Sequence, residues 1–171
     1  MIQSTHENSG FKEKKFPIIL VLDSITSPAN IASLFRLADA FNIEKIIFCG
    51  TESPDLNSNR LKRTARSTIN SVAHEHQEDI LAVCNELSEN DYELFALEIA
   101  EGSEAIDSVN FGDHKKIALV LGNENTGISE GVLKKANKSL HINMFGKNSS
   151  MNVAQAAGIA LFEITKSLQP V

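Results

Sequence analysis

The sequence has no apolar run approaching the ~18–20 residues that a membrane-spanning helix requires, and its polar stretch 1–15 lacks the apolar segment of a secretory signal. It has only two cysteines, Cys49 and Cys84, with no metal-ligand spacing around either. These absences predict no membrane association and no metal site. They favour a cytoplasmic protein whose two cysteines are reduced and buried. Neither proline nor glycine is enriched, and 42% of the residues are hydrophobic, which is typical of a globular domain.

Apolar runs typical of strands alternate with helical patterns, and 171 residues are enough for one domain with a substantial core. The expected strands are Pro17–Leu22, Lys45–Cys49, Glu93–Glu98, Lys116–Leu121 and Leu140–Ile142. The expected helices are Ala29–Phe41, Gln77–Glu89, Ser129–Lys135 and Asn152–Leu168. This alternation predicts an α/β fold with a mostly parallel sheet and helices on both faces. We expect residues 1–15 to form a polar tail and residues 16–171 to form a single domain.

Acidic residues outnumber basic ones, and the formal net charge is −6. This balance argues against nucleic-acid binding as a property of the whole surface. The basic residues are nevertheless clustered. One cluster has four members within seven residues and no acid among them: Arg60, Lys62, Arg63 and Arg66. A second contains Lys134, Lys135 and Lys138. A charge run is usually a solvated helix face, so the pattern alone leaves open whether the first cluster contacts phosphate.

The first segment with candidate chemistry, residues 27–41 (SPANIASLFRLADAF), contains Asn30 and Arg36. These two residues are six positions apart, so they lie ~120° apart around a helix rather than on one face. Helical side chains lean toward the N-terminus, so the long Arg36 side chain can reach back to the end where Asn30 lies. Taken alone, the pattern favours a cap at Asn30 and a surface Arg36 over a functional pair.

In the second segment, residues 117–129 (IALVLGNENTGIS), a buried strand runs into Gly122, Glu124 and Gly127. The segment lacks the Gly-Lys-Ser/Thr ending of a phosphate loop and the Gly-x-Gly-x-x-Gly order of a dinucleotide fingerprint. Two glycines after a strand usually indicate a plain tight turn. They also permit a ligand to approach the backbone closely at the carboxyl end of the strand.

In the third segment, residues 142–163 (INMFGKNSSMNVAQAAGIALFE), a polar loop precedes a helix rich in small residues. Ser150 and Asn152 crowd the helix start, where capping is their ordinary role. The small residues let another backbone approach the helix closely: Ala154, Ala156, Ala157, Gly158 and Ala160.

In this order and near these separations, the three segments resemble the motifs of the SpoU/TrmH class of the SPOUT superfamily, whose members are RNA ribose 2′-O-methyltransferases. The first segment matches N-x-x-x-x-x-R and the second matches G-x-E-x-x-G. The third matches at Ile142, Met144, Gly146, Ser150, Asn152 and Val153. The resemblance spans residues 16–168 and is to a minimal, single-domain member. Three departures from the family pattern, at Ala32, Asn143 and Met151, remove no proposed functional side chain.

The resemblance implies a C-terminal trefoil knot, a homodimer and S-adenosylmethionine as cofactor. It implies that the final helix packs at the dimer interface, with Arg36 of one subunit beside the cofactor of the other. Cofactor contacts carried over by position are largely through backbone groups and come from Leu97, Gly122, Ile142, Met144, Ser150 and Met151.

Methylation of a ribose oxygen requires the 2′-hydroxyl to be held in line with the methyl group and its proton to be removed or stabilised. A guanidinium with a pKa above ~12 is a poor base. The resemblance implies that Arg36 is the base. We instead interpret Arg36 as a phosphate-anchored cation that lowers the pKa of the hydroxyl and stabilises the developing alkoxide. Asn30, Ser150 and Asn152 are expected to orient Arg36 and the ribose. Glu124 is expected to hold the loop or the partner subunit.

The expected substrate is structured RNA, tRNA in the first place and rRNA as the alternative. The expected RNA-facing residues are Arg60, Lys62, Arg63 and Arg66, with Lys12, Lys14 and Lys15 of the tail as an additional contact. A conventional Rossmann enzyme is disfavoured because no glycine fingerprint follows the first strand. A catalytically silent RNA-binding module is the other alternative, and the retention of every catalytic side chain argues against it.

Overall fold

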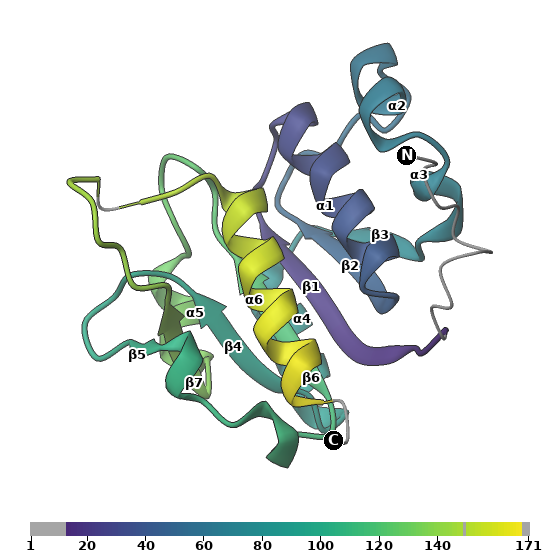
Figure 1. Cartoon of the computed structure of the whole chain (residues 1–171). Coiled ribbons are helices and arrows are strands. Elements are labelled where there is room, and N and C mark those ends of the chain that lie inside the picture. Colours follow the sequence, from purple (N-terminus) through teal and green to yellow (C-terminus); the bar gives the residue numbers. More distant parts are fainter. Residues whose placement is uncertain (1–12, 149, 169–171) are drawn as a thin grey trace, which may run out of the picture.

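The computed structural model describes residues 13–148 and 150–168 (Figure 1). Most of the predicted polar tail, including Lys12, therefore lies outside the described residues. Within the described residues, seven strands form one sheet in the order β3-β2-β1-β6-β4-β7-β5, and every pair of neighbours is parallel. The strands are β1 (Phe16–Asp23), β2 (Ile43–Cys49), β3 (His74–Gln77), β4 (Glu93–Leu97), β5 (Glu104–Ala105), β6 (Ile117–Leu121) and β7 (Lys138–His141).

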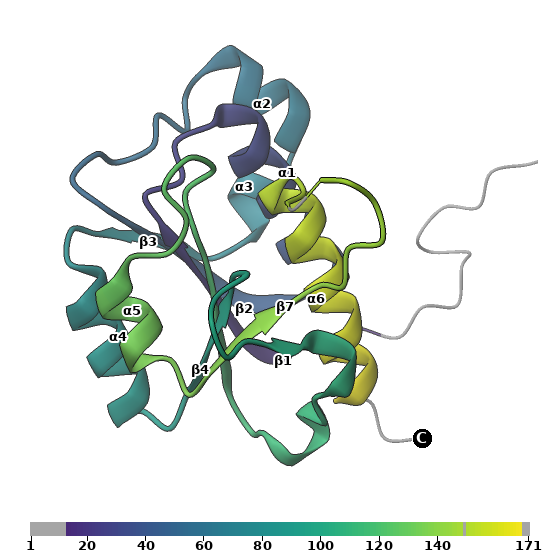
Figure 2. The same ribbon diagram turned by 90° about the vertical axis from the view of Figure 1, so that its left-hand side faces the viewer.

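Helices cover both faces of this sheet, so the predicted α/β class is confirmed (Figures 1 and 2). One face carries α1 (Pro28–Ala40), α2 (Asn59–Ala65), α3 (Thr68–Ser71), α6 (Val153–Ser167) and two 3₁₀ turns, η2 (Ile106–Ser108) and η3 (Phe111–Asp113). The other face carries α4 (Ile80–Glu89) and α5 (Glu130–Lys135). Within the described part of the chain, no helix is both long and apolar enough to cross a membrane.

Strand β1 shows why its sequence is apolar at consecutive positions. Ile18, Leu20 and Leu22 pack toward the side of α1 and α6. Ile19 and Val21 pack toward the side of α4 and α5. All five side chains are buried because both faces of a parallel sheet are covered by helices.

The ends of the two main helices lie within one residue of the predictions. Pro28 occupies the first turn of α1, where its missing N–H costs nothing, and Ser27 is the N-cap residue. Helix α6 begins directly after Asn152, whose side chain accepts hydrogen bonds from the backbone N–H groups of Ala154 and Gln155.

The predicted helix Gln77–Glu89 is wrong at its start. Residues 74–77 form the edge strand β3, which pairs with β2, and α4 begins only at Ile80. The Asp79 side chain caps α4 by accepting from the N–H groups of Leu81 and Ala82 at 2.8 and 3.1 Å. The sequence HEHQ carries no apolar alternation, so this strand was not expected.

Both cysteines are unpaired and buried in the layer between the sheet and α4, as predicted. Burial raises the pKa of the Cys49 thiol to about 12 and that of Cys84 to about 11. At neutral pH both thiols are therefore protonated and pack as apolar groups rather than acting as nucleophiles.

Strands β1, β4 and β6 end at the same edge of the sheet because they run parallel. The chain leaves β1 toward β2 on one side, whereas β4 and β7 lie on the other side of β6. Such a change of direction is where open α/β sheets bind ligands, beyond the carboxyl ends of their strands. The trefoil knot implied by the resemblance stays a prediction.

Candidate functional site

The three sequence motifs meet at this edge in one series of side-chain hydrogen bonds. The Asn30 Nδ2 group donates to the carboxylate of Glu124, and Asn30 Oδ1 accepts from Nδ2 of Asn152 at 2.8 Å. Asn152 Oδ1 in turn accepts from the backbone N–H groups of Ala154 and Gln155 at 3.0 and 3.3 Å. The start of α6 is thereby linked through α1 to the loop after β6.

Asn30 is the third residue of α1 and is 8% exposed, so its capping interpretation is wrong. Its side-chain amide donates to Glu124 of the second motif and accepts from Asn152 of the third. The nitrogen and the oxygen of this buried amide are therefore both hydrogen-bonded. The capping interpretation holds instead for Asn152. Ser150 lies exposed in the loop before α6.

The glycines of the second motif have distinct geometric roles. Gly127 has a φ of +67° and closes a turn in which its N–H donates to the Asn123 carbonyl at 2.9 Å. A Cβ on Gly122 would lie 2.4 Å from the Gly127 carbonyl carbon and 2.5 Å from the Ile128 nitrogen. Only glycine fits there, because the two ends of the loop touch at that point.

Two hollows lie beside these residues and share part of their walls. The larger, of about 750 Å³, lies between the end of β4, the loop 122–128 and the start of α6. The smaller, of about 90 Å³, extends toward the end of β7. The predicted cofactor residues all line one or both: Leu97, Ser150 and Met151 line both, Gly122 lines the larger, and Ile142 and Met144 line the smaller.

Glu98 lines both hollows and was missed by the sequence analysis. Its two carboxylate oxygens accept from the backbone N–H groups of Ile99 at 3.0 Å and Ile128 at 3.2 Å. The available signal was its position directly after strand β4, at the carboxyl edge where ligands bind.

The basic residues that the sequence analysis assigned to catalysis and RNA binding do not line the hollows. Arg36 is exposed on α1, lines neither hollow and makes no hydrogen bond or ion pair within the described residues. Within one chain, the described side-chain partners of Asn30 are Glu124 and Asn152, and the contact with Arg36 that the reach-back argument predicted is not among them. Helix α2 packs against α1 and carries the exposed cluster Arg60, Lys62 and Arg63, with Arg66 as its C-cap.

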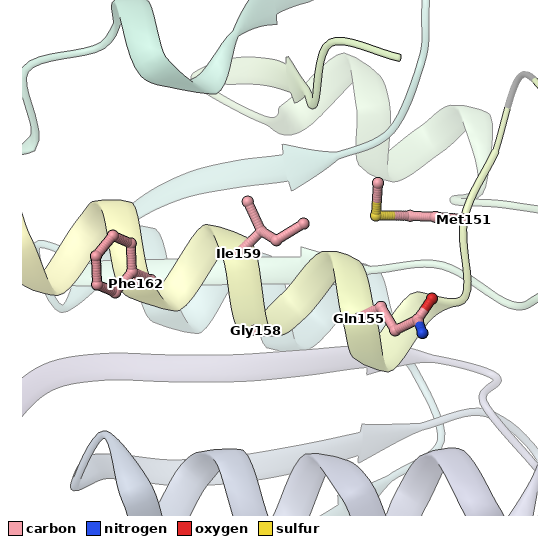
Figure 3. Close-up of a pocket in the computed structure, with 5 residues that line it drawn as sticks. All are labelled: Met151, Gln155, Gly158, Ile159 and Phe162. Atoms are coloured by element: carbon pink, nitrogen blue, oxygen red, sulfur yellow. The ribbon is translucent and has the colours of Figure 1, made fainter. Parts of the chain in front are cut away.

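Two of the small residues of α6 are not available to a second subunit. Ala157 and Ala160 are fully buried in the core on the side of α1, so their assignment to the dimer interface is wrong. The outer side of α6 instead carries an apolar groove of about 560 Å³ (Figure 3). Ile159 and Phe162 line it and are 40% and 56% exposed.

The profile of the SpoU rRNA Methylase family matches residues 17–162. The chain belongs to this family. The resemblance identified from the three motifs is therefore confirmed, and so is the parallel α/β fold that it implied.

Three related proteins show how far the similarity extends. An uncharacterized tRNA/rRNA methyltransferase of Borreliella burgdorferi is 32% identical over 92% of this chain and 68% of its own length. The structure of an AdoMet-bound rRNA methyltransferase from Sinorhizobium meliloti is 24% identical, with a TM-score of 0.82 over 91% of this chain and 59% of that one. A structure reported for the 2-OH methylation of C/U34 on tRNA is 27% identical, with a TM-score of 0.77 over 88% of this chain and 95% of that one. The SpoU-family chain spans 57–68% of the length of the curated relatives it matches.

Proposed function

We propose that this SpoU-family chain is an S-adenosylmethionine-dependent methyltransferase that modifies ribose 2′-hydroxyl groups of structured RNA, with tRNA as the expected substrate and rRNA as the alternative. The observation that carries the proposal is the hydrogen-bonded series Glu124–Asn30–Asn152 at the rim of the larger hollow. It joins all three family motifs around one cavity. The proposal implies a cytoplasmic protein, because its RNA substrates are there.

The hollows suit the proposed cofactor in size and chemistry. Their combined walls offer apolar side chains, including Leu97, Ile142 and Met151, together with the exposed backbone of the loop 122–128. Gly122 lets the two ends of that loop meet, and Gly127 leaves room for the Glu98 carboxylate at the cavity wall. When bound, S-adenosylmethionine would supply a sulfonium methyl group for transfer to the 2′-oxygen, which would leave the sulfur as a neutral thioether and release the hydroxyl proton.

The residues of this chain would hold and activate the ribose. Asn152 and Ser150 stand at the rim of the larger hollow, where they can orient the 2′-hydroxyl. Asn30 keeps Asn152 in position, and Glu124 keeps Asn30 in position. The Arg36 guanidinium would stabilise the developing alkoxide and anchor the neighbouring phosphate.

Arg36 reaches neither hollow of its own chain, so the proposal requires a homodimer in which a second copy supplies it. The apolar groove on the outer side of α6 supports such an assembly, because Ile159 and Phe162 leave exposed apolar area close to Met151, which lines the groove and both hollows. The exposed basic residues of α2, packed beside α1, would extend the RNA-facing surface from Arg36.

The test is methyl transfer from labelled S-adenosylmethionine to purified tRNA and, separately, to ribosomal RNA. We expect label in one 2′-O-methylnucleoside after complete digestion of the RNA, and no label with the Arg36→Ala protein. Nucleoside analysis of RNA from cells lacking this protein should show that the same 2′-O-methylnucleoside is missing. Label on a base would contradict the proposed reaction. RNA binding without transfer to any cellular RNA would favour the catalytically silent RNA-binding module.

A further inference from the structure

Glu98 is held in place at the junction of the two hollows. Its Oε1 accepts from the Ile99 N–H at 3.0 Å and its Oε2 from the Ile128 N–H at 3.2 Å. A Cβ built on Gly127 would lie only 2.6 Å from Oε2, so the absence of a side chain at Gly127 makes room for the carboxylate. Each oxygen retains a lone pair that these backbone groups do not use.

The ionisable side chains that line the hollows are acidic or histidine. Among the described residues, they are Glu98, Glu124 and His141, and no lysine or arginine lines either cavity. Glu124 accepts from Asn30, and His141 Nδ1 is 2.9 Å from the Ser103 hydroxyl. Glu98 is the carboxylate common to both walls, and no described cation lies within ion-pair distance of it.

We propose that Glu98 makes this site select the methyl donor, whose sulfur is positively charged, over its product, whose sulfur is neutral, an inference that rests on the proposed function. S-adenosylmethionine carries a positive charge on its sulfur, and S-adenosylhomocysteine does not. A fixed carboxylate in a partly enclosed cavity attracts the charged ligand, because the effective dielectric constant there is well below that of water. The adenosine and amino-acid groups are common to both ligands, so contacts with them do not supply this difference.

The selection has a kinetic consequence. Loss of the positive charge during transfer removes the attraction, so the spent ligand is held less tightly than the reactant. The same attraction stabilises the reactant more than the transition state and therefore does not accelerate the chemical step. Glu98 is thus a specificity-determining residue that limits product inhibition.

The experiment compares wild type and Glu98→Gln by calorimetry with three ligands: S-adenosylmethionine, S-adenosylhomocysteine and sinefungin, in which a protonated amine replaces the sulfonium. We expect the Gln protein to bind S-adenosylmethionine and sinefungin roughly threefold to tenfold more weakly and S-adenosylhomocysteine nearly as well as wild type does. Glu101→Gln is the matched control, because Glu101 is exposed nearby in the chain and lines neither hollow. It should change none of the three affinities.

Equal weakening of all three ligands would overturn the inference, because it would assign Glu98 to the shared adenosine or to loop stability. Glu98→Asp keeps the charge and provides a second test if the Gln protein is unstable. It should retain the preference for the charged ligands even where overall affinity falls, and loss of that preference would also overturn the inference. Failure of wild type to bind any of the ligands would count against the proposed function itself.

Discussion

The side-chain amide of Asn152 donates to Asn30 Oδ1 at 2.8 Å, across 122 positions of sequence. Asn30 extends the series by donating its own amide hydrogen to Glu124. Neither asparagine could be replaced by aspartate without loss, because each must donate as well as accept. This requirement accounts for asparagine rather than aspartate at both positions.

Asn30→Asp should destabilise the fold by about 1–3 kcal/mol, because it removes a buried donor and sets a carboxylate against Glu124. Urea unfolding at neutral pH measures the loss. The second substitution Glu124→Gln should restore part of it, since glutamine can donate to the new carboxylate. Asn125→Asp, on the exposed loop beside Glu124, is the control and should change stability little. Additive effects of the two substitutions would contradict the coupling.

Gly122→Ala should destabilise the protein by about 1–3 kcal/mol and weaken cofactor binding, because the new Cβ meets the backbone of Gly127 and Ile128. Unfolding and calorimetry on the same samples separate the two effects. Gly146→Ala is the matched control, since nothing lies within 4 Å of its added Cβ. A Gly122→Ala protein as stable as wild type would show that the loop opens without cost.

The sequence predicted elements whose pattern is local. The apolar runs of β1 and β6 and the capped helices α1 and α6 were recognisable because propensity, burial and capping agree within each segment. Strand β3 was missed because its pairing with Ile46–Cys49 of β2 is a long-range interaction that HEHQ does not encode. The sequence also did not determine what packs against Ala157. A small residue permits close approach by α1 of the same chain as readily as by a second subunit.

The site was predictable only in part, for a related reason. The motif residues could be named from their resemblance to a family, but not their hydrogen bonds to one another. Glu98 carries no motif of its own. Its place in the cavity depends on Gly127, which lies 29 positions later and leaves space for the carboxylate.

Charge reversal on α2, Arg60→Glu with Arg63→Glu, should weaken RNA binding and flatten its dependence on salt. The log–log slope should fall by about one unit for each phosphate that the variant no longer neutralises. Filter binding across a salt series checks this, while cofactor affinity should stay unchanged. Lys134→Glu with Lys135→Glu, on α5 at the opposite face of the sheet, is the control. Equal effects of the two pairs would mean that α2 is only a solvated surface.

Phe162→Glu should convert the proposed dimer into a folded monomer of 18.7 kDa, because it puts a charge into the apolar groove of α6. Sedimentation at micromolar concentration measures the change, and methyl transfer should fall with it. Ala157→Leu provides the contrast: it should cost about 1–3 kcal/mol of fold stability by overpacking the core and leave the folded protein dimeric. A wild-type protein that methylates RNA as a monomer would contradict the proposal that a second subunit supplies Arg36 to the site.

Arg36→Ala should abolish methyl transfer while leaving cofactor binding nearly intact, because Arg36 lines neither hollow. Losing a donor that stabilises an oxyanion lowers a rate by ~10²–10³, and removal of a phosphate anchor adds to this. Arg36→Lys separates the two possible roles, since lysine has a lower, tunable pKa but cannot form the bidentate fork. We expect lysine to be nearly as inactive as alanine in single turnover with saturating RNA. Activity restored by lysine, with a new basic limb in the pH profile, would instead identify proton abstraction as the main role. Near-wild-type turnover by Arg36→Ala would remove Arg36 from the site altogether.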